Sequence, residues 1–239
     1  MTAATRPTTR VAIVGDGKMG RTLVQLAPER GFLVCALIGA QANDGGRGIT
    51  KGALNGAEVV IEFTEPAAAA ANVEAALRAG VPIVSGTTGW YSELPAIRDL
   101  AAETKGALFV APNFSVGVAV FARVAEYAAG ALSALESFDA HLLETHHRAK
   151  KDAPSGTAAM LQEVSSAALK RDIPVTSVRT GSVPGTHELI FDAPFEQIRL
   201  THEARDRRVF ADGALLAARW LIGRSGVFGM NDLLDSLLP

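Results

Sequence analysis

Short apolar runs alternate with amphipathic stretches along the first half of the chain. Runs of strand length cover residues 11–14, 32–38, 58–63, 81–85 and 108–111, and helical patterns lie between them, through Ala27, from Pro66 to about Ala79 and from about Glu93 to Lys105. This rhythm is typical of right-handed βαβ units that build a parallel sheet, in which ligands bind at the carboxyl ends of the strands. We therefore expect the loops at Gly15, Thr64, Gly86 and Asn113 to lie along one edge of that sheet.

The pattern changes after Ser115. A helix is expected from about Gly117 to Gly130, and the alternating run at 138–145 indicates a strand with one solvated face. A helix from Thr157 to Lys170 then leads to strand candidates at 175–180, 187–191 and 197–204, with turns marked by Gly181, Pro184 and Gly185. These elements predict a second domain built on a mixed or antiparallel sheet.

The end of the chain is expected to belong to the first domain. Residues 209–222 form a long apolar helical pattern, and the tail at 227–238 is too short to be a domain. The sequence thus predicts an α/β protein whose first domain, residues 1–112, is completed by residues 211–239. Residues 113–210 would form an α+β domain with a mixed sheet for substrate binding and oligomerisation.

A glycine-rich turn follows the first strand and opens the first helix. It reads Gly15-Asp16-Gly17-Lys18-Met19-Gly20, which has the G-x-G-x-x-G spacing. Glycines at these positions permit a tight turn, let backbone N–H groups approach a pyrophosphate and allow a helix to pack closely on a strand. We therefore expect the first domain to be a Rossmann domain that binds a dinucleotide.

The sequence leaves open which dinucleotide is preferred. A fold that prefers NAD usually carries Asp or Glu at the end of the second strand, for the ribose hydroxyls. The chain reads Ile38-Gly39-Ala40-Gln41 there, and the nearest carboxylate, Asp44, lies in a glycine-rich loop. No carboxylate is therefore expected to repel a 2′-phosphate, and Lys18 could attract one. We expect both NADH and NADPH to work.

The most concentrated chemistry lies in residues 144–158, which read ETHHRAKKDAPSGTA. Two imidazoles and two lysines precede Asp-Ala-Pro, which interrupts any helix, and Ser155-Gly156-Thr157 then opens an alanine-rich helix. Unpaired N–H groups at a helix N-terminus, the positive end of the helix dipole and lysine ammonium groups together favour an anion. This run should be the active site, and a small dicarboxylate would suit it.

For several residues in this region a structural role is an alternative to a chemical one. His146 and His147 are adjacent, so in an extended segment only one imidazole faces the reaction. Ser155 lacks a G-x-S-x-G elbow, which makes helix capping and anion binding better roles for it than nucleophilic attack. Asp152 is equally a turn residue, and Glu144 is expected to pair with a nearby lysine or arginine.

Residues of the later strands are not expected to join the site. For Arg179, His187 and His202 on the predicted sheet, a solvated or subunit-facing position is the default. No metal site is expected, because the cysteine is remote, the adjacent histidines lack a H-x-x-x-H spacing, and His187 and His202 have no ligand companions in the sequence.

Composition limits the compartment and the partners. The 239 residues, 48% hydrophobic, suffice for two modest domains, and the formal net charge of −2 provides no cationic field for nucleic acid or an anionic membrane. A single cysteine, Cys35, cannot form an intrachain disulfide, which fits a reducing compartment. The polar stretch Met1–Arg10 and the lack of about 18 consecutive apolar residues favour a cytoplasmic, untargeted protein with no membrane span.

Further segments agree with the signature of a known family. They are the run at 144–158, Gly15–Gly20, Gly86–Gly89, Ala111–Val118, Arg179-x-Gly181, Gly185-x-His187 and Thr201-His202-x-Ala204. On these residues, over nearly its whole length, the chain resembles the bacterial 4-hydroxy-tetrahydrodipicolinate reductase (dihydrodipicolinate reductase) family of the diaminopimelate route to lysine. The glycine loop is one residue shorter than in many members, and the acidic cofactor residue is missing.

The resemblance implies an NADH- or NADPH-dependent reductase that acts as a homotetramer assembled through the second sheet. Hydride would come from the nicotinamide and a proton from His146, with Lys150 also catalytic. His147, Lys150, Gly156 and Thr157 would hold the substrate, and we add Ser155 as an anion binder. The cofactor positions would be Gly15, Asp16, Gly17, Lys18, Met19, Gly20, Gly86, Thr87, Thr88, Ala111, Pro112, Asn113 and Phe114.

Two other functions are alternatives for this sequence. A different Rossmann reductase, such as an aspartate or semialdehyde dehydrogenase, would share the glycine turn, but the semialdehyde enzyme would need a catalytic cysteine, and Cys35 is misplaced for that. A nucleotide-sensing protein that had lost catalysis would be expected to have replaced His146 or Lys150, and both are present.

Overall fold

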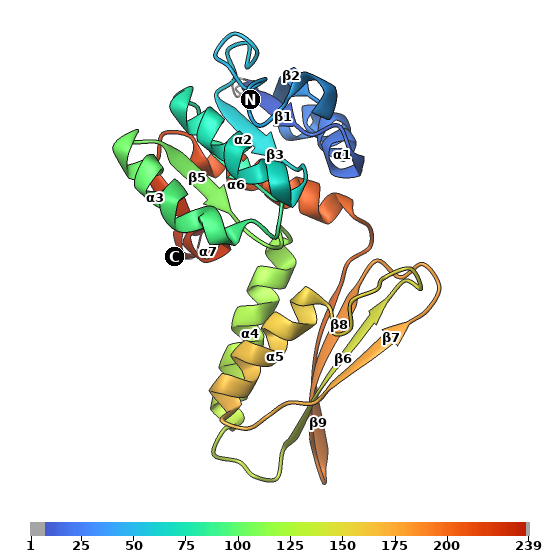
Figure 1. The fold of residues 1–239 in the computed structure, drawn as a ribbon. Coiled ribbons are helices and arrows are strands. Elements are labelled where there is room, and N and C mark those ends of the chain that lie inside the picture. Colours follow the sequence, from blue (N-terminus) through green and yellow to red (C-terminus); the bar gives the residue numbers. More distant parts are fainter. Residues whose placement is uncertain (1–7, 238–239) are drawn as a thin grey trace, which may run out of the picture. The chain divides into compact units, whose positions relative to one another are not determined.

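The computed structural model describes residues 8–237, which divide into two compact units (Figure 1). The first unit runs up to Phe114 and resumes at Phe210, and the second unit is Ser115–Val209. Among the described residues, no helix combines the length and the apolar character that a bilayer span requires.

The first unit is built on a six-stranded sheet in which every strand pairing is parallel. Its strand order is β10-β5-β4-β3-β1-β2. The strands are β1 (Thr9–Val14), β2 (Phe32–Ile38), β3 (Val59–Glu62), β4 (Ile83–Ser85), β5 (Ala107–Val110) and β10 (Gly226–Phe228). Because the strands run in the same direction, the loops at Gly15, Thr64, Gly86 and Asn113 follow their carboxyl ends at one edge, as predicted.

Helices cover both faces of this sheet. They are α1 (Lys18–Leu26), α2 (Pro66–Arg78), α3 (Leu94–Glu103), α6 (Arg208–Leu221) and α7 (Met230–Leu237). Val11 and Ile13 of β1 pack in a core with buried residues of α1, α6 and α7, whereas Ala12 and Val14 pack in a core with α2 and α3. Burial on both faces explains why these strands are continuous apolar runs in the sequence.

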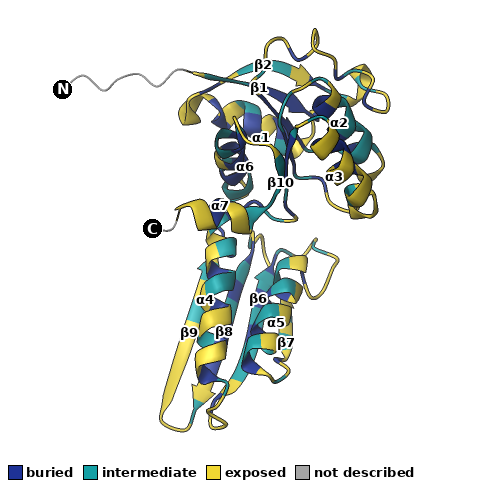
Figure 2. Cartoon of the chain, turned by 90° about the vertical axis from the view of Figure 1, so that its left-hand side faces the viewer, coloured by how far each residue is buried: buried dark blue, intermediate teal, exposed yellow. Residues whose placement is uncertain are grey.

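The second unit packs two helices on one face of a four-stranded sheet. The helices are α4 (Val116–Leu132) and α5 (Gly156–Leu169), and the strands, in the order β7-β6-β8-β9, are Val175–Arg179, Asp139–His146, Thr186–Ala193 and Glu196–Glu203. β6 and β7 are parallel, and the other two pairings are antiparallel. The edge strand β9 is mostly exposed (Figure 2).

The predicted fold class is confirmed: a parallel α/β sheet and a separate α+β unit with a mixed sheet. The tail lies in the first unit, where β10 pairs with β5. Several elements begin or end a few residues away from the predicted positions. For example, the strand predicted at 58–63 is Val59–Glu62, because the chain after Glu62 turns into a loop held by hydrogen bonds to that carboxylate.

Candidate active site

The register of the second sheet brings together side chains that are far apart in the sequence. Alternation along β6 points Leu142, Glu144 and His146 into the buried side of the strand. Glu144 pairs with Ser177 on β7 and with His187 on β8. Paired residues on neighbouring strands point to the same face, so the carboxylate and imidazoles form one cluster.

Glu144 is the fully buried centre of this cluster. One carboxylate oxygen, Oε1, accepts hydrogen bonds from the Ser155 backbone N–H at 3.0 Å, the Ser177 hydroxyl at 2.6 Å and the Arg179 guanidinium at 2.7 Å. Burial by itself would raise the pKa of Glu144, but these donors outweigh it and lower the pKa to about 2. Glu144 is therefore a fixed negative charge at neutral pH.

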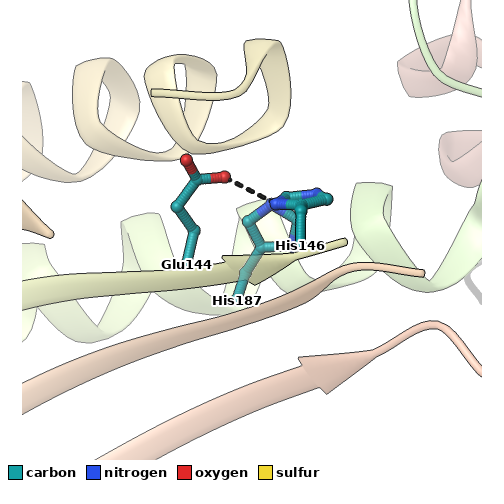
Figure 3. A group of neighbouring side chains, drawn as sticks. All are labelled: Glu144, His146 and His187. Carbon is teal, nitrogen blue, oxygen red and sulfur yellow. Dashed lines mark ion pairs between the residues drawn. The ribbon is translucent and has the colours of Figure 1, made fainter. Parts of the chain in front are cut away.

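His146 lies beside the other oxygen of that carboxylate. Its Nδ1 is 2.9 Å from Glu144 Oε2 (Figure 3), and the residue is 7% exposed. On the other side of the ring, a Cβ at Gly185 would approach Nε2 to 3.0 Å, so glycine leaves room for the imidazole there. Burial lowers the pKa of His146, and Glu144 partly opposes this. The ring is oriented through Nδ1 and leaves Nε2 as the atom for proton exchange.

His187 is a second buried imidazole next to the first. The two ring centroids are 5.2 Å apart with the planes at 73°. The Nε2 of His187 is 3.3 Å from the Ser155 hydroxyl. Burial, then the neighbouring His146, lowers the pKa of His187 to about 4, so this ring is neutral at pH 7.

The N-terminus of α5 is anchored to the same cluster. The Ser155 hydroxyl accepts from the Ala158 N–H at 3.1 Å, which makes Ser155 the N-cap, as expected. Gly156 is exposed, with open space where a Cβ would lie, and Thr157 is half-buried. The helix thus presents small residues and its positive end at the site.

Lys150 is near the imidazoles but is paired with a carboxylate. Its Nζ lies 2.8 and 2.9 Å from the two oxygens of Asp152, whose pKa this hydrogen bond lowers. Asp152 is thus a charged partner as well as a turn residue. His147 is half-buried, and its backbone carbonyl accepts from the Lys150 N–H at 3.1 Å.

The expectations for two residues of the later strands, Arg179 and His187, are wrong. Arg179 is ion-paired with Glu144, and His187 is 4% exposed within the cluster, so neither is solvated. His202 is half-buried, with its ring against Phe121, and burial lowers its pKa. Sequence alone could not place them, because pairing across β7, β8 and β9 decides which face they occupy.

The view that His187 lacks ligand companions is also wrong. Glu144, His146 and His187 each offer one ligand atom, and these atoms lie within 4.8 Å of one another (Figure 3). However, the Arg179 guanidinium lies 2.7 Å from the same carboxylate and would repel a metal cation, and the other oxygen, Oε2, already faces Nδ1 of His146 at 2.9 Å. The chemistry of this donor set suits an oriented imidazole better than a bound metal.

The glycine turn of the first unit forms a backbone site. Gly15 has a φ of 105°, and a Cβ there would meet the Phe63 carbonyl oxygen at 2.0 Å; one at Gly20 would meet the Gly15 carbonyl at 1.9 Å. Gly17 has only open space around such a position, and as N-cap of α1 it supplies no side-chain cap. No side chain therefore caps the first amides of α1, and a helix N-terminus of this kind favours an anion such as a phosphate.

The other predicted cofactor residues lie at the same edge of the sheet, but they differ in burial and in their contacts. Thr87 is buried and donates to the Glu62 carboxylate at 2.7 Å, while Thr88 is exposed. The ring of Phe114 lies in the core and packs edge-on against the ring of Phe63. The remaining predicted positions are Lys18 and Pro112, which are exposed, Met19, Gly86 and Asn113, which are half-buried, and Ala111, which is buried.

A parallel sheet with an open glycine turn, in a chain that also carries a buried acid–imidazole cluster, defines a dinucleotide-dependent oxidoreductase. Comparison with known proteins gives the family. The model described as dihydrodipicolinate reductase, N-terminus, matches residues 9–114, and the model for the C-terminus matches residues 117–234. The chain belongs to the dihydrodipicolinate reductase family.

Curated relatives and solved structures agree with this assignment. The 4-hydroxy-tetrahydrodipicolinate reductases of Acidiphilium cryptum and Thiobacillus denitrificans are 40% and 37% identical, each covering 94% of this chain and 97% and 98% of their own lengths. The dipicolinate-bound dihydrodipicolinate reductase from Paenisporosarcina sp. TG-14 shares the fold, with a TM-score of 0.78, 22% identity and coverage of 94% of this chain and 99% of that one.

Proposed function

We propose that this chain reduces 4-hydroxy-tetrahydrodipicolinate to tetrahydrodipicolinate with NADH or NADPH, in the diaminopimelate route to lysine. Its curated relatives are named for this reaction, and a structure with the same fold binds dipicolinate, a planar dicarboxylate. The observation that carries the mechanism is the imidazole of His146, oriented by the buried carboxylate of Glu144 at 2.9 Å.

The dinucleotide would be held by the glycine turn. The N–H groups that open α1 at Gly17 and Lys18 would bind the pyrophosphate, and Gly15 and Gly20 keep the turn tight enough for that approach. The loops at Gly86–Thr88 and Ala111–Phe114 follow β4 and β5 at the same edge and would complete the cofactor site. When bound, the nicotinamide supplies the hydride.

His146 would supply the proton that the ring carbon needs after hydride addition. Burial lowers the pKa of His146 in the free protein, so the ring is mostly neutral at pH 7. A dicarboxylate bound nearby adds negative charge, which raises that pKa and protonates Nε2 when it is needed. Glu144 stabilises the resulting imidazolium through Nδ1.

The substrate carboxylates would be held by cations and backbone amides. Lys150 supplies an ammonium group, and the N-terminus of α5 supplies the N–H groups around Gly156 and Thr157, ordered by the cap at Ser155. His147 would contribute a further polar contact at the end of β6. Lys150 can exchange Asp152 for a substrate carboxylate without losing charge pairing.

We also propose a cytoplasmic homotetramer. The helices of the second unit cover one face of its sheet, and Val178, which pairs with Thr145 on the other face, is 37% exposed, which supports a subunit contact through the sheet. Light scattering should give a mass of about four chains at micromolar concentration; a particle of 24.9 kDa would contradict the assembly. The lone Cys35 supports the reducing compartment.

The activity can be tested directly. Substrate is generated in situ from pyruvate and aspartate semialdehyde, and oxidation of NADH and of NADPH is followed by absorbance. We expect oxidation that depends on the substrate. No oxidation with either cofactor, in protein that a thermal melt shows to be folded, would contradict the proposed function.

A further inference from the structure

The first unit contains a cavity of about 300 Å³ at the carboxyl ends of β1 and β2. The glycine turn forms one wall, and the residues that follow β2 and β3 form the others. This is the position at which an open α/β sheet binds the adenosine half of a dinucleotide. The side chains around it therefore decide which ribose fits.

The carboxylate of Asp16 lies against Gly39, directly after β2. An ideal Cβ on Gly39 would be 2.5 Å from Asp16 Oδ2 and 3.3 Å from Oδ1. The backbone of Gly39 is extended, with φ −86° and ψ 173°, so any residue could adopt it. A side chain at Gly39 would have to displace the carboxylate of Asp16, which occupies that space.

The end of β2 has no carboxylate of its own, but the carboxylate of Asp16, from the glycine turn, lies beside it. The second strand of a Rossmann fold ordinarily ends in the carboxylate that accepts from the ribose 2′-hydroxyl. Here that position is Gly39, and Asp16 fills the volume next to it. Asp16 and Gly39 together thus place a carboxylate where other Rossmann folds have a single acidic residue.

The charged residues around the cavity also favour a ribose with free hydroxyls over one that carries a phosphate. Its lining includes the carboxylates of Asp16 and Glu65, and none of the described lining residues is a lysine or an arginine. Arg21 donates to the backbone carbonyl of Asp16 at 3.0 Å, and Arg47 is paired with Asp44 at 2.8 Å. Lys18 is exposed and lies outside the lining.

We propose that Asp16, seated against Gly39, is the specificity residue that selects NADH over NADPH. The inference rests on the proposed function, because it assumes that this cavity receives the adenosine ribose. Asp16 accepts hydrogen bonds from the ribose hydroxyls, whereas the 2′-phosphate of NADPH would bring about two negative charges against it. This carboxylate supplies the repulsion that the sequence did not reveal.

The test is direct binding of each dinucleotide to the full chain by calorimetry. The wild type should bind NADH at least about tenfold more tightly than NADPH, which is about 1.4 kcal/mol. Asp16→Asn, which keeps the shape and removes the charge, should bring the ratio of the two dissociation constants to about one, mainly by tightening NADPH. Equal affinities in the wild type, or a ratio unchanged in Asp16→Asn, would overturn the proposal.

A double variant tests whether position, rather than the residue itself, carries the selectivity. Asp16→Ala should lose the preference, and Asp16→Ala combined with Gly39→Asp should restore it, because the carboxylate then comes from the end of β2. A double variant no more selective than Asp16→Ala would contradict this account. Asp44→Asn, a carboxylate removed outside the cavity lining, is the matched control and should keep the wild-type ratio.

The same data separate this inference from the proposed function. If the wild type binds both dinucleotides and oxidises them equally well, the reductase stands and the role of Asp16 fails. If neither NADH nor NADPH binds to folded protein, the proposed function fails, and the assignment of Asp16 fails with it.

Discussion

The two units of this protein build their sites from different materials. In the first unit, the glycine turn offers backbone amides, and what matters is the absence of side chains at Gly15, Gly17 and Gly20. In the second unit, buried side chains form the site, with Glu144 held by three donors and His146 held by Glu144. One site depends on chain geometry, the other on charges kept out of water.

This difference decides how each site should fail. No substitution except by proline removes a backbone N–H, so the first site is damaged mainly by adding atoms. The second site is damaged by removing atoms, because an imidazole or carboxylate that is lost has no substitute and leaves buried partners unpaired. Single substitutions in one unit should therefore leave the function of the other intact.

The largest effect is expected from His146→Gln. Glutamine keeps a polar side chain but cannot deliver a proton, so kcat should fall by about 10² to 10⁴ with KM little changed. Steady-state kinetics measure this loss, and calorimetry should show unchanged binding of the dinucleotide by the first unit.

His141→Gln is the matched control for this variant. His141 lies on the same strand, but its Nε2 contacts Thr176 at 2.9 Å, away from Glu144. It should keep wild-type kinetics. Near-normal kcat in His146→Gln, or lost dinucleotide affinity, would refute the role of His146 as the acid.

The next effect concerns the stability of the second site against acid. The folded pKa of His187 is lowered to about 4, below its usual 6.5, so the unfolded chain binds the extra proton between these values. The resulting stability is complete above pH 6.5 and is lost as the pH falls towards 4. At about 1.4 kcal/mol per unit, the wild type should lose on the order of 3 kcal/mol across this window through His187.

Denaturant unfolding of wild type and His187→Asn at several pH values checks this prediction. The variant should be less stable at pH 7, where the packing of the imidazole is lost, but its stability should fall less between pH 6.5 and 4. Parallel curves for the two proteins would show that His187 is not a buried neutral group.

A smaller effect is expected from Lys150→Ala. Loss of a charge-assisted bond should raise KM by about one to two decades, and the unpaired carboxylate of Asp152 would then repel an anionic substrate. Lys151→Ala, next in the chain and exposed, should change KM much less. Similar KM values for both variants would mean that Lys150 holds no substrate carboxylate.

The smallest effect tests the first unit by adding one methyl group. Gly17→Ala meets no neighbouring atom within 4 Å, so the melting temperature should hold while dinucleotide affinity falls roughly tenfold. Gly15→Ala would collide with the Phe63 carbonyl and should instead lower the melting temperature. If Gly17→Ala bound dinucleotide normally, the pyrophosphate would have to lie elsewhere.

The same contrast explains what the sequence could predict. The parallel sheet was predictable because each strand, turn and helix leaves a local pattern, and Gly15 to Gly20 are contiguous. The N-cap at Ser155 was predictable for the same reason. The mixed sheet was also expected, but the pairing of strands within it was not.

The rest of the second site depended on that pairing. Glu144 meets Ser177 and His187 only because β6 lies between β7 and β8 in one register, and a shift of one residue would turn each side chain to the opposite face. Asp16 was expected among the cofactor positions, but its placement beside Gly39 was missed for a related reason. Its contact with Gly39 joins two loops, and no short-range pattern reports it.

The core that β1 shares with α6 also has a consequence for how the protein is made. Buried residues of α6 complete the apolar layer against Val11, Ile13 and Phe109, yet they leave the ribosome only after residues 115–209. At usual rates of translation that interval lasts roughly 5 to 20 s. During it the second unit has all of its own residues, whereas the face of the first sheet that carries α1 lacks the rest of its cover, from α6 and α7, and keeps apolar surface exposed to water.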